Sequence, residues 1–366
     1  VGGGIGGLTA AIALRRQGYA VEIIERDPEW TVYGVGIIQQ MNVVRAMKQI
    51  DVLDDYVEKS FGFDKVSTFV GPQGMAVPPA ETPRLAGPEY PSNAGIRRTD
   101  LQAVLGNAVK AAGADLRLGV TVDSFVDDGD GVDVTFSDGQ SKRYDIVIGA
   151  DGLFSQMREA ILPDAPKPRY TGQWVWRYNL PRPAELDGIH LYAGPCNAGL
   201  VPMSEDLMYM FLVSEEPENT WLETEGAAEK MRARSQMAPE ALKPWVAQIT
   251  DDAGVVARPM DVIFLKDDPW HKGRVVLIGD AVHASTPHLA QGAGMAIEDG
   301  IVLAEEMTKA TTAEAAFSAY RDRRYKRVSH VALNSELIGD YQMGKVKDLD
   351  PAVLNVETIK MMCEPI

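Results

Sequence analysis

The chain begins with VGGGIGGLTAAIALRRQGYAVEIIE, residues 1–25, and this run predicts a glycine-rich turn followed by a helix and a strand. Apolar residues recur at helical spacing over residues 8–17, so we expect a helix there. Gly18 stands where a glycine commonly ends a helix. Residues 19–25 are rich in strand-forming side chains. Turn, helix and strand in this order indicate an α/β fold built on a parallel sheet.

Three glycines in the first turn have the spacing of a dinucleotide-binding fingerprint. Gly2 allows a tight turn, Gly4 lets a phosphate approach the backbone, and Gly7 lets the helix pack close to the strand. Glu25 ends the next strand, where a carboxylate can accept hydrogen bonds from the ribose hydroxyls of an adenosine. The spacing therefore predicts a nucleotide site, and a tight turn without a ligand is the alternative.

A glycine turn of this kind usually follows a complete strand, but only Val1 precedes it. We therefore expect that a few residues precede Val1. No signal peptide is visible in the printed sequence, and a leader further upstream stays an open alternative.

The composition is that of an ordinary globular protein with an acidic surface. With 366 residues, the chain has the length of about two domains. Its 36 Lys and Arg against 52 Asp and Glu give a net charge of −16, which disfavours nucleic acids and anionic membranes as partners. Two cysteines, Cys196 and Cys363, are too few for a disulfide framework and fit a cytoplasmic protein. Five histidines leave little material for a metal site, and no apolar run is long enough to predict a membrane span.

The middle of the chain is rich in predicted strands. We expect one meander from three strand-like runs that Asp-Gly turns separate, namely 116–126, 131–136 and 144–149. A second, antiparallel sheet is expected from residues 173–180, 189–192, 198–203 and 207–213. In the first of these runs Trp174, Trp176 and Tyr178 alternate onto one face, which we interpret as a core face.

A second glycine turn follows a short apolar strand late in the chain. Residues 272–280 predict this strand, which ends at Gly279-Asp280, and a helical pattern dominates after residue 293. Small residues connect the strand to the helix, whose N-terminus offers N–H donors to an electron-rich ring. Asp280 is placed to accept a hydrogen bond from a sugar-like chain.

Three motifs in this order resemble those of the single-component flavoprotein aromatic hydroxylases, the family of p-hydroxybenzoate and salicylate hydroxylases. The motifs are the glycine turn with Glu25, the DIVIGADG run at residues 145–152, and Gly279-Asp280 with residues 287–299. The chain looks most similar to the salicylate, 3-hydroxybenzoate and 6-hydroxynicotinate hydroxylase subgroup. The resemblance implies FAD as cofactor, NAD(P)H as a transient co-substrate, and O2.

The resemblance also implies the architecture: α/β, with a Rossmann-like FAD domain of the p-hydroxybenzoate hydroxylase type, an inserted β-sheet substrate domain and C-terminal helices. We expect a discontinuous FAD domain at residues 1–70, 96–170 and 259–310. The substrate domain is expected at residues 71–95 and 171–258, and the C-terminal helical segment at residues 311–366.

The resemblance assigns cofactor roles to particular residues. Those expected at the ADP half of FAD are Gly2, Gly4, Gly7, Glu25, Arg26 and Val122. Those expected at its polar chain and flavin ring are Arg98, Asp280, Pro287, Gly292, Ala293 and Gly294. Asp151 matches a position implicated in handling both FAD and NAD(P)H, and a carboxylate that only caps the turn is the alternative. Residues 290–294 lack the asparagine of many members, so only backbone contacts are expected there.

His288 is the predicted catalytic residue. In the subgroup this position faces the substrate beside the flavin, and a histidine that titrates near neutral pH can accept the proton whose loss activates the ring. A histidine that only fills space is the alternative. The predicted substrate-binding residues are Tyr209, His190 and Asn197, with core or surface roles as alternatives, whereas His283 is expected to be structural.

The implied reaction is hydroxylation of a small aromatic or N-heteroaromatic compound through a flavin C4a-hydroperoxide. A flavin-dependent reductase, dehydrogenase or epoxidase on the same fold is one alternative, and a non-enzymatic flavin-binding protein is another. The substrate, the choice between NADH and NADPH, and assembly as monomer or homodimer are open. The basic run at residues 321–327 predicts a solvated helix face or subunit contact.

Overall fold

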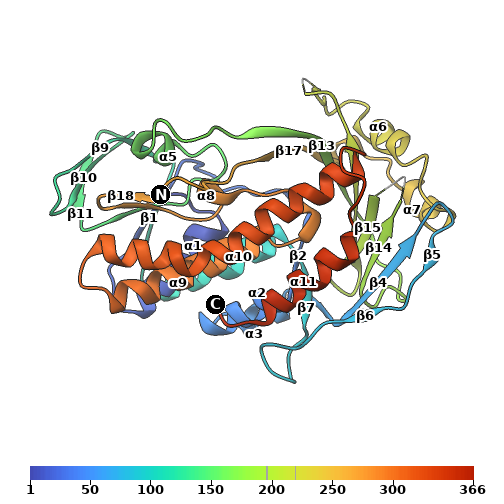
Figure 1. The fold of residues 1–366 in the computed structure, drawn as a ribbon, viewed down its shortest axis with the longest axis horizontal. Coiled ribbons are helices and arrows are strands. Elements are labelled where there is room, and N and C mark those ends of the chain that lie inside the picture. Colours follow the sequence, from blue (N-terminus) through green and yellow to red (C-terminus); the bar gives the residue numbers. More distant parts are fainter. Residues whose placement is uncertain (195–196, 219) are drawn as a thin grey trace.

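The computed structural model describes residues 1–194, 197–218 and 220–366. Cys196, one of the two cysteines considered above, lies outside the described residues. The architecture is α/β, as predicted, with a parallel-sheet part and a large, mostly antiparallel sheet (Figure 1). A long helix, α10 (Ala313–Gln342), runs across both parts, from strand β18 (His271–Lys272) to strand β13 (Arg169–Pro181).

The first two residues hold the parallel sheet together. Strand β1 (Glu22–Glu25) pairs in parallel with β8 (Asp115–Leu118), and β12 (Val147–Gly149) pairs in parallel with β19 (Val275–Leu277), which β18 extends. Val1 and Gly2 lie between the two pairs: Gly2 N–H donates to the Ile24 carbonyl at 2.9 Å, and Ala150 N–H donates to the Val1 carbonyl at 2.8 Å. The glycine turn thus leaves the middle of the sheet at strand carboxyl ends, where α/β sheets bind ligands.

Two helices pack against each other over this sheet. Helix α1 (Ile5–Arg16) is buried from Leu8 to Leu14 and lies against α9 (Gly292–Lys309). A Cβ on Gly300 would lie 2.6 Å from the backbone nitrogen of Ala10, so only glycine allows this approach. Gly18 has φ +89° and ends α1 as predicted.

The predicted meander is correct over only part of its length. Strands β9 (Val122–Asp127), β10 (Val132–Phe136) and β11 (Ser141–Tyr144) form an antiparallel three-stranded sheet. The expected strand at 116–126 divides into β8 and β9, because Gly119, with φ +74°, turns the chain between them. The expected strand at 144–149 likewise divides into β11 and β12, because residues 147–149 join the parallel sheet instead.

The large sheet contains eight strands and includes the predicted antiparallel runs. In spatial order they are β17 (Val256–Val262), β13, β16 (Leu207–Glu215), β15 (Asn197–Pro202), β14 (Ile189–Ala193), β4 (Lys65–Val70) and β5 (Met75–Ala76), with β6 (Ala80–Glu81) also paired to β4. Trp174, Trp176 and Tyr178 are buried on one face with apolar residues of helix α6 (Ala227–Arg234), so their interpretation as a core face is confirmed.

A small sheet and short helices complete the fold. Strands β2 (Gly36–Gln39), β7 (Asn93–Arg97) and β3 (Phe61–Phe63) form this small sheet. The remaining helices are α2 (Met41–Gln49), α3 (Leu53–Glu58), α4 (Arg98–Ala111), α5 (Gln156–Ile161), α7 (Lys243–Val246), α8 (Asp280–His283) and α11 (Pro351–Cys363), with single 3-10 turns at Glu240–Leu242, Asp252–Gly254 and Pro287–Leu289. Strand β4 belongs to the large sheet although it lies before residue 71, where the substrate domain was expected to begin. Strand β7 belongs to the small sheet although it begins before residue 96, where the FAD domain was expected to resume.

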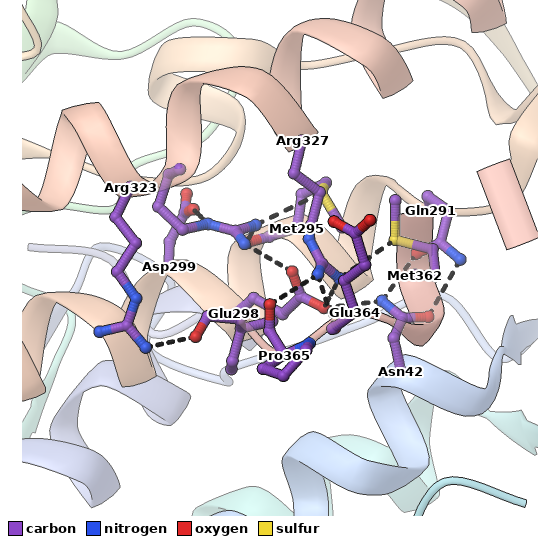
Figure 2. Close-up of polar contacts among 12 residues, drawn as sticks. Asn42, Gln291, Met295, Glu298, Asp299, Arg323, Arg327, Met362, Glu364 and Pro365 are labelled. Atoms are coloured by element: carbon purple, nitrogen blue, oxygen red, sulfur yellow. Dashed lines mark hydrogen bonds and ion pairs between the residues drawn. The ribbon is translucent and has the colours of Figure 1, made fainter. Parts of the chain in front are cut away.

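The basic run at 321–327 is only in part the solvated face that the sequence predicts: Asp322 and Lys326 are exposed, but Arg324 and Arg327 are buried. Arg324 and the acids Glu298 and Asp299 have side chains at most 1% exposed, and the guanidinium contacts both carboxylates at 2.6 and 2.8 Å. Arg327 also donates to Glu298, at 3.2 Å (Figure 2). Burial alone would raise the pKa of Asp299, but His283 and Arg324 lower it below its usual range. Arg324 and Arg327 point into the protein because Glu298 and Asp299 of α9 offer them buried partners.

Glu298→Gln should lower the free energy of unfolding by about 3–5 kcal/mol, because it leaves the buried guanidinium groups of Arg324 and Arg327 without a full counter-charge. The matched control is Glu305→Gln on the same helix, whose partner Arg323 is partly exposed. Its cost should stay below about 1 kcal/mol. Urea unfolding followed by circular dichroism measures both, and equal losses would contradict this role of the network.

Candidate functional site

The glycine turn has the geometry of a phosphate cradle. A Cβ on Gly2, which has φ +104°, would lie 2.3 Å from the Ala150 carbonyl oxygen, and one on Gly7 would lie 2.0 Å from that of Gly2. By contrast, no atom lies within 4 Å of a Cβ built on Gly4. Helix α1 begins just after Gly4 without a side-chain cap. Its first N–H groups therefore face open space, as an anion site requires.

Glu25 and a tryptophan fix the outer side of this turn. The Glu25 carboxylate accepts hydrogen bonds from the N–H groups of Gly3, at 2.8 Å, and Asp27, at 2.9 Å. The indole N–H of Trp30 donates to the Gly3 carbonyl at 2.8 Å. Arg26 is exposed. The carboxylate is thus placed beside the open turn, and ribose binding by Glu25 stays a prediction.

The predicted second segment lies close to the first, since a Cβ built on Gly6 would be 3.4 Å from the Cβ of Ala296 in α9. The N–H of Gly279 donates to Asp299 at 2.9 Å, and the buried His283 pairs with the same carboxylate oxygen at 2.6 Å. His283 therefore has the structural role that the sequence predicts. The side chain of Asp280 is accessible although many protein atoms lie around it. Burial raises the pKa of Asp280, and the neighbouring charges of His283 and Arg98 oppose that rise.

The N-terminus of α9 is the second open helix end. Gln291 precedes the helix without capping it through its side chain. A Cβ on Gly292 would meet only the Ser285 Oγ, at 3.6 Å. That hydroxyl is buried and has no hydrogen-bond partner among the residues that the structure describes. Gly294 instead packs on Val43, at 2.9 Å from a built Cβ, so the open space lies at the first residues of the helix.

Gln291 is a positioning residue that the sequence did not reveal. Its amide forms two reciprocal hydrogen bonds with the amide of Asn42, both at 3.0 Å (Figure 2). It also donates to Gln40, at 2.6 Å. Asn42 donates in turn to Glu298 at 2.9 Å. The start of α9 is therefore tied to α2 and to the buried ion network. The sequence offered one signal for this role, a glutamine that comes just before Gly292 and Gly294 at the predicted turn.

The predicted substrate residues do not all lie together. Tyr209 is buried against β2, because a Cβ on Gly36 would lie 2.3 Å from its ring. Asn197 shares that sheet face but lies at the start of β15, opposite Val213 rather than Tyr209. His190 is opposite Leu200, on the other face, where its ring packs on Phe69 at 5.3 Å. His190 therefore points away from Tyr209, because a strand alternates its side chains.

His288 is held by protein on both ring nitrogens. Nδ1 lies 2.8 Å from the Thr286 hydroxyl, and Nε2 lies 3.0 Å from the Gln342 amide oxygen. Burial lowers the pKa of His288 to about 4, against the opposing hydrogen bond to Gln342. The expected titration near neutral pH is therefore wrong, and the imidazole is neutral at physiological pH. Pro287 opens the 3-10 turn that carries it.

The remaining predicted cofactor residues have local roles that the structure describes. Asp151 accepts hydrogen bonds from the Ser155 hydroxyl at 2.5 Å and from the Met157 N–H at 3.0 Å, as its capping alternative requires. Val122 begins β9 and is partly buried. Arg98 is enclosed near Tyr209 and Asp280, and burial lowers its pKa. Arg177, which no sequence pattern singled out, is partly buried and lies near Arg98 and Tyr209.

These features fit an elongated dinucleotide with a ring at its far end. Two helix N-termini lack side-chain caps, Glu25 lies beside the first of them, and Arg98 and Asp280 are electrostatic neighbours of one another. Within the described ranges, no group of three or more His, Cys, Asp or Glu is arranged to hold a metal ion. No helix in the described part of the chain is long and apolar enough to cross a membrane. The fold and site thus define an FAD-dependent flavoprotein.

The chain belongs to the family described as FAD binding domain, whose family model matches residues 1–335. It is a flavoprotein monooxygenase of the class A aromatic hydroxylases. Aurachin C monooxygenase/isomerase of Stigmatella aurantiaca is 31% identical over 355 residues, covering 94% of this chain and 88% of that protein. The 6-hydroxynicotinate 3-monooxygenase of Bordetella bronchiseptica is 31% identical over 352 residues, covering 90% and 88%.

The fold is also that of a solved flavoprotein. The crystal structure of Klebsiella pneumoniae HpxO complexed with FAD and uric acid matches with a TM-score of 0.83 and 24% identity, over 100% of this chain and 92% of that one. The predicted fold class is therefore confirmed.

Gly4→Ala places a methyl group into open space, so it should change the free energy of unfolding of the flavin-free protein by no more than about 0.5 kcal/mol. The same methyl group would occupy the position that a phosphate approaches, so FAD affinity should fall at least about tenfold, by roughly 1.4 kcal/mol. Flavin fluorescence titration measures the affinity. Gly7→Ala is the contrasting variant and should destabilise the protein with or without FAD. Unchanged affinity in Gly4→Ala would place the pyrophosphate elsewhere.

Acid should destabilise the protein partly through His288. Between the ordinary pKa of 6.5 and the lowered value of about 4, the unfolded chain binds a proton that the folded protein excludes. Stability is therefore lost as the pH falls through this window. In His288→Gln this contribution is absent, so its thermal midpoint should fall less steeply than that of the wild type between pH 7 and pH 4.5. Parallel curves would mean that His288 is protonated in the folded protein.

Proposed function

We propose that this protein hydroxylates a small aromatic or N-heteroaromatic compound, with NAD(P)H as the reductant and O2 as the source of the oxygen atom. The observation that carries the proposal is the match of the FAD-binding family to residues 1–335 together with the two open helix N-termini of α1 and α9. Bound FAD would supply the redox and oxygen chemistry, and the hydroperoxide route expected from the sequence belongs to this proposal.

The chain's own residues would hold the cofactor at several points. The open turn at Gly4 and the N–H groups of α1 fit the pyrophosphate. Arg98 and Asp280 lie where the polar chain of the flavin would pass, and N–H groups at Gly292 and Ala293 fit the ring edge. Free donors aimed at a ring stabilise negative charge there without reorganisation.

The large sheet would supply the substrate wall. Tyr209 lies in a buried cluster with Phe63, Val201 and Met203, and the partly buried Phe211 packs against it. Such a wall keeps water out while the reactive oxygen species exists. The phenol of Tyr209 would orient a substrate oxygen as a neutral group, because burial raises its pKa to about 12.

His288 stays the proposed proton acceptor, now as a neutral imidazole. Because Gln342 offers an amide oxygen to Nε2, that nitrogen carries the proton in this arrangement and Nδ1 holds the lone pair. The Thr286 hydroxyl donates to Nδ1, so a substrate proton can reach it only when this hydroxyl turns away or relays the proton. Proton transfer by this residue should therefore show no ionisation of its own between pH 6 and pH 9.

The decisive experiment follows labelled oxygen from O2. The FAD-loaded protein is offered NADH or NADPH with hydroxybenzoates, hydroxypyridines and quinolones. Stimulated NAD(P)H oxidation with one labelled oxygen atom in the ring hydroxyl of the product is the expected result. A reductase or dehydrogenase would oxidise NAD(P)H or substrate without label in the product, and an epoxidase would give a labelled epoxide. His288→Ala that retains the full rate across pH 6–9 would exclude His288 as proton acceptor.

Two finer expectations also belong to this proposal. The low cysteine content supports a cytoplasmic setting. Assembly as a monomer or a homodimer stays a prediction, and sedimentation of the FAD-loaded protein distinguishes the two.

A further inference from the structure

Arg177 is a cation in the middle of an otherwise mostly apolar strand. On β13 it lies opposite Phe211 of β16 and Val256 of β17. Alternation along the strand places its side chain on the face that Tyr209 and Phe211 share, opposite the core face of Trp174 and Trp176. Tyr209 packs on β2, so this face points towards the cofactor part of the protein.

The guanidinium of Arg177 has no protein partner in the described part of the chain. It makes no hydrogen bond or ion pair there, whereas the buried Arg158 donates to the carbonyls of Ala281 and Leu153, both at 2.9 Å. Arg324 is likewise fully paired with Glu298 and Asp299. Arg177 is only partly buried, so its guanidinium is accessible to a ligand, and an anion beside it would supply the partner that the described residues do not.

The charged and titratable groups near Arg177 indicate which kind of ligand would suit it. Its electrostatic neighbours are Arg98, which repels it, and Tyr209, which is neutral at physiological pH. Burial, followed by the charge of Arg98, lowers the pKa of Arg177 to about 10. Arg98 has Asp280 as an acidic neighbour, but no acidic residue acts on Arg177 among those described. The place beside Arg177 therefore favours an anion.

We propose that Arg177 binds the anionic group of the substrate, a carboxylate or an ionised ring oxygen, and so selects aromatic acids over their neutral analogues. This inference rests on the function proposed above. A planar guanidinium with several donors matches a carboxylate through two parallel hydrogen bonds. The rings of Tyr209 and Phe211, with centroids 6.3 Å apart, lie on the same face and fit an aromatic body beside that anion.

A second arginine on this face provides a matched control. Arg258 of β17 is opposite Val175 and therefore shares the face of Arg177. It is exposed, its guanidinium covers the ring of Tyr33 at 4.4 Å, and its Nε donates to the Tyr33 hydroxyl at 3.1 Å. Because Arg258 already has a partner and lies at the surface, its removal should leave substrate selection unchanged.

The test measures binding to the FAD-loaded protein, without turnover. The probes are two acid and amide pairs: 3-hydroxybenzoate with 3-hydroxybenzamide, and 6-hydroxynicotinate with 6-hydroxynicotinamide. Their dissociation constants come from the change in flavin absorbance on titration. We expect the wild type and Arg258→Gln to bind at least one acid about tenfold or more tightly than its amide. Arg177→Gln should lose this preference by weakening acid binding alone, and Arg177→Lys should restore part of it.

Two titration results would overturn the proposal. They are a wild type that shows no preference for either acid, and an Arg177→Gln variant that keeps the preference. Because Arg177 has no protein partner, Arg177→Gln should also be at least as heat-stable as the wild type, and failure to fold would reveal a structural role. Labelled-oxygen incorporation tests the hydroxylase function separately, since the titration needs no catalysis.

Discussion

The close contact of α1 with α9 is the constraint on which the rest of the site depends. Gly300 lets α9 approach the backbone of Ala10, and Gly7 lets α1 approach the turn at Gly2. These contacts fix the distance between the two helix N-termini that offer free N–H groups. An extended dinucleotide that binds both ends needs that distance held rigidly, because flexible donors would lose entropy on binding. The glycines therefore serve packing and binding together.

The buried ion network holds the second helix in place. Arg324 joins α10 to Glu298 and Asp299 of α9, and Asn42 connects Glu298 to Gln291 at the start of the same helix. The far end of α10 also carries Gln342, the partner of His288. Helix α10 thus carries partners both for the helix that begins at the proposed flavin contact and for the histidine proposed to accept a proton. Arg327, which also pairs with Glu298, donates hydrogen bonds to the backbone carbonyls of Glu364 and Pro365 (Figure 2).

The parallel sheet and the large sheet contribute different groups to the proposed site. The parallel sheet and its helices provide the backbone donors that are proposed to bind FAD. The large sheet provides side chains on one face, among them Tyr209, Phe211 and Arg177, which take no part in those backbone donors. Substrate choice in this chain should therefore be sought on that sheet face.

The sequence by itself determined the nucleotide turn, the family, the α/β class and the shared core face of Trp174, Trp176 and Tyr178, because each depends on local spacing. Only the tertiary structure decided that Arg324 and Arg327 of the basic run are buried, that the expected meander divides between two sheets, and that His190 points away from Tyr209. Burial in the tertiary structure lowers the pKa of His288, and the fold brings Arg177 beside Arg98. These properties depend on burial and on partners distant in sequence, and a local pattern does not contain them.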